Sequence, residues 1–139
     1  MISEKTIQIC GKDVQMRYCA AAETGYEQLS GQSSEIFVPE VERDDEGNIT
    51  NVINHAKAED YIKLGLAAIF AAYSRKDEDA PIKAEEILYD AEPGEVQNLI
   101  NTVMELRAKW YEVSPVVAEK SDIQESTEEA ENDDKPKNA

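Results

Sequence analysis

The stretch that decides the fold is DYIKLGLAAIFAAYS, residues 60–74, the only long segment of the chain that is almost wholly apolar. Its large apolar side chains, with Gly65 and alanines between them, surround the whole helical wheel. A helix that is apolar on every side is a buried helix, and at 15 residues it is too short for a bilayer, which takes roughly 20. We therefore expect a central core helix from about Lys57 to about Lys76.

Residues 5–18 predict a tight antiparallel hairpin ahead of that helix. A two-residue turn at Gly11–Lys12 would pair Ile9 with Val14 on an apolar face and leave polar side chains on the other face. One apolar and one polar face, consistent along both strands, is what a half-buried hairpin needs. Glycine in the turn supplies the positive φ of a I′ or II′ turn.

Three further helices are expected, over residues 20–29, over residues 84–90 and from Pro93 until Pro115 ends the segment. Gly31 would cap the first of them, and proline is favoured at the first position of a helix. Apolar residues at three- and four-residue steps predict the buried face of the last helix. This face comprises Val96, Ile100, Val103, Met104, Arg107 and Trp110.

Two β-prone runs, residues 36–41 and 49–53, lie between the helix expected at residues 20–29 and the central helix. They flank the sequence DDEGN at residues 44–48, a strong turn signal. We expect a second hairpin in which Pro39 marks an edge strand, with disorder over part of residues 31–48 as the alternative. The fold class is then α+β, with both hairpins packed on a small helical bundle.

The chain is long enough for one domain, which we place at residues 1–116. Residues 117–139 have almost no apolar content and carry many acidic side chains. Such a segment cannot bury enough surface to offset the entropy lost on ordering. We expect it to be a disordered acidic tail.

The formal net charge of −16 limits the partners. Residues 119–139 contribute −5, so −11 remains on residues 1–118. An acidic surface repels nucleic acid and anionic membranes and attracts basic partners, so we expect neither nucleic acid nor membrane binding. The N-terminus lacks an apolar signal-peptide core, and two cysteines fit reduced thiols in the cytoplasm.

Nothing in the sequence carries a strong catalytic or metal-binding signature, so we expect no enzyme activity and no cofactor. Residues 44–48 are faintly similar to a calcium loop, but Ile53 stands where a bidentate glutamate is required, and a turn is favoured. His55 is the only histidine, and no nucleophile motif accompanies it. The acidic pairs Glu85-Glu86 and residues 77–79 are typical of solvated loops and helix starts.

Two features could serve a protein partner. Gly65, Ala68 and Ala72 form a small-residue stripe on the central helix, for which internal packing is the default and a groove for a partner helix the alternative. Trp110 and Tyr111 are adjacent, so both cannot face the same way on one helix. An exposed aromatic is a candidate binding anchor, whereas packing at the core edge is the commoner role.

Residues 5–113 resemble the small tail assembly chaperones of long-tailed bacteriophages and prophages, most closely those of Bacteroides-type prophages. The resemblance lies in the order of elements, and residues 35–55 fit it least. The segments that carry it are TIQICGKDVQMRY, AAAETGYEQLSG, EDYIKLGLAAIFAAYSRKDEDAPI and ILYDAEPGEVQNLINTVMELRAKWYEV.

The resemblance implies a non-enzymatic role in the cytoplasm of a bacterial host. Such chaperones bind the long, aggregation-prone tape measure protein and keep it soluble while the tail tube assembles around it. Many also occur as a longer, frameshifted form that recruits the tail tube protein. Trp110 and Tyr111 are then our candidate partner-binding residues, and a homo-oligomer is left open.

A rival interpretation is an acidic decoy that imitates nucleic acid and occupies a basic host nucleic-acid-binding protein. It would require carboxylates arrayed along one face at near-phosphate spacing. Here they are scattered through loops and helix ends, so the sequence favours the chaperone.

Overall fold

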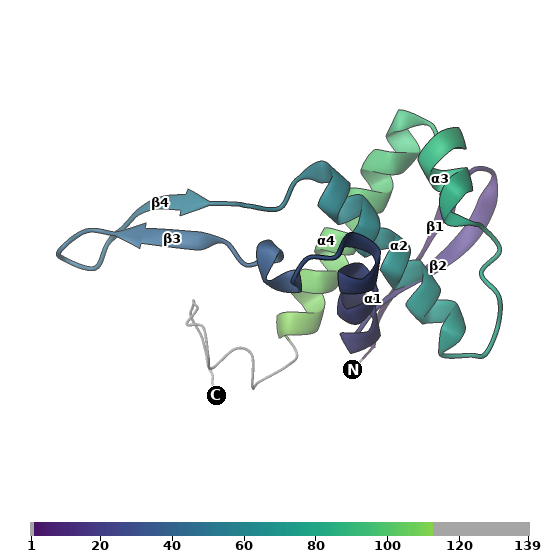
Figure 1. The fold of residues 1–139 in the computed structure, drawn as a ribbon, viewed down its shortest axis with the longest axis horizontal. Helices are drawn as coiled ribbons and strands as arrows, with labels where there is room; N and C mark the ends of the chain where they lie inside the picture. The colour runs from purple at the N-terminus through teal and green to yellow at the C-terminus, as the bar shows by residue number, and fades with distance from the viewer. Residues whose placement is uncertain (1, 113–139) are drawn as a thin grey trace.

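A computed structural model of the protein describes residues 2–112 and confirms the α+β class. Two separate two-stranded antiparallel sheets accompany four α-helices (Figure 1). The expected tail and Pro115 lie outside the described residues. The elements are β1 (Ser3–Ile9), β2 (Lys12–Tyr18), α1 (Ala20–Ser30), the 3-10 helix η1 (Ser34–Phe37), β3 (Glu40–Arg43), β4 (Ile49–Ile53), α2 (Ala58–Ser74), α3 (Ala84–Asp90) and α4 (Pro93–Glu112).

The first hairpin forms, but the expected register was wrong by two residues. Ile9 pairs with Lys12 and Ile7 with Val14, so the turn residues are Cys10 and Gly11. Both have positive φ, 52° and 75°, which is the requirement of a type I′ turn. Because side chains alternate with a period of two, this shift leaves every residue on its expected face. The apolar face is buried, as predicted.

An acidic side chain holds this turn in place. The backbone N–H of Cys10 donates to Oε2 of Glu95 at 2.9 Å, and Oε1 of the same carboxylate accepts the N–H of Glu92 at 3.0 Å. Glu95 therefore caps the start of α4 and ties it to the β1–β2 turn. A left-handed conformation is unusual for cysteine, and this contact helps to stabilise it.

Helix α2 is the centre of the core, as its sequence predicts. Nine of its residues are buried, on all sides of the helix. Figure 1 shows α2 between α1, α4 and the β1–β2 hairpin. A Cβ placed on Gly25 of α1 would lie 3.0 Å from Cβ of Ala67, and one on Gly65 would lie 2.9 Å from Cγ of Leu99. Small residues therefore let both neighbouring helices approach α2 closely.

Helix α4 begins at Pro93 as expected, but its buried face differs in part from the prediction. Met104 is 45% exposed, whereas Leu99 and Leu106 are fully buried. The reason is that α4 packs against β1 as well as α2, so its buried stripe is centred nearer Leu99 and Leu106. At the β1 contact, the Ser3 hydroxyl donates to the carbonyl oxygen of Leu106 at 2.7 Å.

One buried carboxylate joins α1 to the start of α2. Asp60 is 4% exposed, and its Oδ1 accepts the Tyr26 hydroxyl at 2.9 Å. Its Oδ2 accepts the backbone N–H of Lys57 at 2.8 Å. The charge is thus shared between a helix cap and a neighbouring helix, which offsets the cost of burial.

The tight contact of Gly65 with Leu99 leads to a first prediction. Gly65→Ala should lower the free energy of unfolding, because crowding a packed core costs about 1–3 kcal/mol and outweighs alanine's helix-propensity gain of about 0.5–1 kcal/mol. Gly94→Ala is the matched control, since nothing lies within 4 Å of its added Cβ. We expect that control to be neutral or slightly stabilising in urea denaturation; equal stability of the two variants would contradict the close approach.

Candidate functional site

The most exposed structured part of the protein is the second hairpin, which we call the arm (β3, β4 and the turn between them, residues 40–53). The expectation that this hairpin packs on the helical bundle was wrong: Figure 1 shows the arm standing out from the helices, which it joins only at its root, because the charged and exposed residues of β3 and β4 pack mainly on each other. Every residue of β3 and β4 is exposed except Ile53, which is half-buried. An isolated two-stranded hairpin is at best marginally stable in water. The arm therefore has surface that another polypeptide could cover.

One face of the arm carries three exposed apolar side chains. Val41 pairs directly with Val52, and Ile49 pairs with Arg43 two positions further toward the tip, past a register shift. Residues two pairs apart share a face of a sheet, so Val41, Ile49 and Val52 lie on one face of the arm, together with Arg43. They are 43%, 56% and 51% exposed. Isolated apolar residues on a surface are ordinary, but a contiguous exposed patch is typical of an interaction site.

The tip of the arm is a self-contained turn. Oδ1 of Asp44 accepts the backbone N–H groups of Glu46 and Asn48, both at 2.9 Å, and Gly47 has a φ of 87°. These backbone hydrogen bonds, that of Asn48 first, lower the pKa of the Asp44 carboxyl. The carboxylate that a calcium loop would use is therefore engaged by the turn itself. Within residues 2–112 no group of three or more metal-ligating side chains converges.

We call the rest of the described fold, the helices together with the β1–β2 hairpin, the body. The root of the arm is anchored in the body by aromatic packing. Phe37 of η1 is buried, with its ring centroid 4.8 Å from that of Tyr26 and 5.0 Å from that of Tyr61. The guanidinium of Arg107 lies 5.9 Å from the Phe37 ring centroid. Just after β4, Nε2 of His55 lies 2.6 Å from Oε1 of Glu40, the first residue of β3. The only histidine thus closes the root of the arm.

Trp110 and Tyr111 lie on the last turns of α4, and both are half-buried against the core. The Tyr111 hydroxyl donates to Oε2 of Glu23, which also accepts the Tyr18 hydroxyl at 2.7 Å. The Arg107 guanidinium lies 4.6 Å from the Tyr111 ring centroid. These contacts match the core-edge alternative for Tyr111. Whether either aromatic binds a partner stays a prediction.

Sequence reasoning missed the exposed side chains of α3. Leu88 is 55% exposed and Tyr89 is 82% exposed. No sequence signal separated these two from Ile87, which is buried. Glu86 of the same helix caps it by accepting the backbone N–H of Lys83 at 2.9 Å, and it also accepts the Lys12 ammonium. The acidic pair at residues 85–86 is therefore a helix start, as expected.

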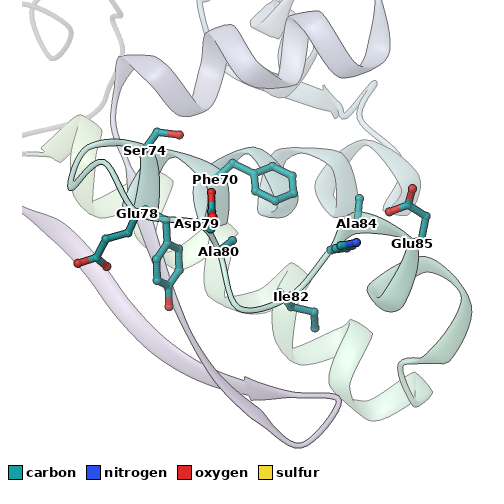
Figure 2. Close-up of a pocket in the computed structure, with 10 residues that line it drawn as sticks. Phe70, Ser74, Glu78, Asp79, Ala80, Ile82, Ala84 and Glu85 are labelled. Carbon is teal, nitrogen blue, oxygen red and sulfur yellow. The ribbon is translucent and has the colours of Figure 1, made fainter.

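A shallow hollow of about 550 Å³ lies between the C-terminal half of α2 and the loop that leads to α3 (Figure 2). Phe70, Ala80 and Ile82 form part of its wall, and Glu78 and Glu85 lie at opposite ends of it. The carboxylates do not converge on a common point.

Comparison of the sequence with protein-family models found no match, and neither curated proteins nor solved structures gave one. Among residues 2–112, no helix combines the length and the apolar character needed to cross a membrane. Function must therefore be inferred from the arm, the charge of the chain and the resemblance noted above.

The arm's exposure leads to a second prediction. Replacing residues 40–53 by a short Gly/Ser linker should change the free energy of unfolding of the body by no more than about 1 kcal/mol, because the arm adds almost nothing to the core and loop closure depends weakly on length. Thermal and urea denaturation of the shortened chain would measure this. A large loss of stability would show that the arm supports the body.

A third prediction concerns pH. Burial, followed by the Glu23 carboxylate, raises the pKa of Tyr111 to about 12, above its ordinary 10.0. As pH rises through this window, the unfolded chain loses a proton that the folded chain keeps, so the free energy of unfolding falls. Tyr111→Phe should therefore lose less stability than the wild type between these pH values. Identical losses in urea denaturation would contradict this role of Tyr111.

Proposed function

We propose that this protein is a bacteriophage or prophage tail assembly chaperone, which binds tape measure protein in the host cytoplasm and keeps it soluble. The single observation that carries the proposal is the arm: an exposed hairpin with three apolar side chains on one face, mounted on a strongly acidic body. The resemblance of residues 5–113 to such chaperones supplies the identity of the partner.

The physical logic is that of a soluble holder. A chain that keeps an apolar partner in solution must offer apolar surface without aggregating itself. The charge of −11 on residues 1–118 opposes self-aggregation of the body. Val41, Ile49 and Val52 offer the apolar contact on an element whose strands are exposed and lie outside the core.

Co-expression tests this proposal and is our fourth prediction. The full chain, co-expressed with the tape measure protein of the same phage or prophage, should raise the soluble fraction of that protein several-fold. The variant with residues 40–53 replaced by a linker should lose most of this effect. An unchanged soluble yield in the presence of the wild-type chain would refute the chaperone role.

The same experiment compares the two candidate surfaces. Trp110→Ala removes an aromatic ring at the end of α4 and leaves the arm intact. If only this variant loses capture, the end of α4 is the contact surface, and the chaperone role stands without the arm. If only the arm variant loses it, the aromatic pair is structural.

Salt dependence separates this proposal from the acidic decoy. A complex that buries apolar surface should keep its affinity as salt rises. Binding of a nucleic-acid mimic to a basic protein should weaken steeply, because its attraction is electrostatic and screened by ions. The described carboxylates support the first case, since several are engaged in caps and turns, including Asp44, Glu86 and Glu95.

A further inference from the structure

The two strands of the arm differ in how their outer edges are protected. Strand β3 carries Glu40, Glu42 and Arg43 and directly follows Pro39. Charged side chains and proline are among the devices by which natural proteins keep an edge strand from pairing with another chain, and bulges are another. Residues 48–54 of the β4 side read NITNVIN, with no charge and no proline, and the one irregularity of β4 is the register shift near its tip end, at residues 49–51.

Strand β4 also has the composition of a strand that pairs readily. Ile49, Thr50, Val52 and Ile53 are all β-branched, the class most favoured in strands. Within residues 2–112 its only partner is β3, in a sheet of two strands. One row of backbone N–H and C=O groups of β4 therefore faces away from β3, as in any edge strand.

We propose that β4 is a self-association edge, at which two copies of this chain pair antiparallel to form a four-stranded sheet of order β3–β4–β4–β3. In that sheet the uncharged strands are central, and the charged β3 strands form the two outer edges. The number of exposed apolar side chains on the joint sheet also doubles, because each copy contributes Val41, Ile49 and Val52. A two-fold arrangement closes on itself and does not continue into a fibre.

Charge selects a second copy over other occupants. Residues 40–48 carry five acidic side chains and one arginine, so a basic partner strand would be drawn to β3 rather than to β4. A helical partner would satisfy its own backbone groups and leave the β4 edge unpaired. The edge thus fits an uncharged strand, and the chain itself carries one.

The position of the arm makes such pairing compatible with the acidity of the body. Two bodies of strong negative charge repel each other at short range, but screening limits this repulsion to about 8 Å at physiological salt. Figure 1 shows the arm projecting away from the helices, so pairing near its outer part keeps the two bodies apart. A strand pair this short is smaller than a standard stable interface, so the dimer should be weak and concentration-dependent.

The self-association can be tested on the purified chain alone, independently of the chaperone role. Sedimentation equilibrium or light scattering over a concentration series should show a reversible dimer that tightens as salt is raised, because added ions screen repulsion between the bodies. A chain that stays monomeric up to about 1 mM, where even a Kd of that size would give substantial dimer, overturns the proposal.

A matched pair of variants locates the contact. Val52→Lys places a charge in each of the two central strands of the joint sheet and should weaken dimerisation about tenfold or more. Val41→Lys introduces the same charge at the residue that pairs directly with Val52, on the same face of the sheet. Because Val41 lies on an outer strand, this variant should weaken dimerisation much less. Equal weakening by both variants would assign the contact to that face and overturn pairing at the β4 edge.

Cross-linking provides a second measurement that does not depend on affinity. Asn51→Cys and Glu42→Cys replace residues that pair with each other on β4 and β3. Mild oxidation should yield disulfide-linked dimers of the first variant in excess of the second and of the wild type, whose Cys10 and Cys19 are the background. Excess cross-linking through Glu42→Cys instead would place the contact on β3 and refute the proposal.

Discussion

The close approach of two helices to α2 is the constraint on which the rest of the structure depends. Gly25 lets α1 lie against Ala67, and Gly65 receives the side chain of Leu99 from α4. With larger residues at either glycine, the neighbouring helix would have to move outward. The β1–β2 hairpin packs against both α2 and α4, so its position would change with them. The core is therefore set by small residues as much as by large ones.

Polar contacts then fix the orientation of elements that apolar packing alone would leave adjustable. Asp60 joins α1 to the start of α2, and Glu95 joins the β1–β2 turn to the start of α4. Glu23 of α1 accepts hydroxyls from β2 and from the end of α4. Each of these carboxylates touches two elements that are distant in the sequence. The acidity of the chain is thus partly structural, and not only a property of its solvent surface.

Much of the fold could be predicted from the sequence because its signals are local. Apolar periodicity, Gly31 and Pro93 were sufficient to place α1, α2, α3 and the start of α4 to within about two residues, whereas the expected end of α4 lies outside the described residues. The hairpin register could not be settled in the same way. Turns at residues 10–11 and 11–12 give the same apolar face, so the choice rested on which residues accept positive φ, and Cys10 is an unusual one.

The candidate site was less predictable, since exposure depends on what lies nearby in space. The sequence gives Val41 and Val52 the pattern of an ordinary half-buried strand, and only the fold shows that no described helix covers them. Tyr111 is the opposite case, a side chain that the fold covers. Glu23 of α1 accepts its hydroxyl, and Arg107, one turn earlier in α4, lies over its ring. Likewise, Met104 was expected on the buried face of α4 but is exposed, and Leu106 is buried instead, because α4 also contacts β1.

The separation of the arm from the rest of the fold lets one small chain expose apolar side chains without drawing on its core. In a bundle helix, exposed valine and isoleucine would compete with the core for the same partners. On the arm, valine and isoleucine lie outside the core, next to the charged side chains of β3 and of the turn. The three exposed side chains Val41, Ile49 and Val52 therefore take no part in the packing around α2.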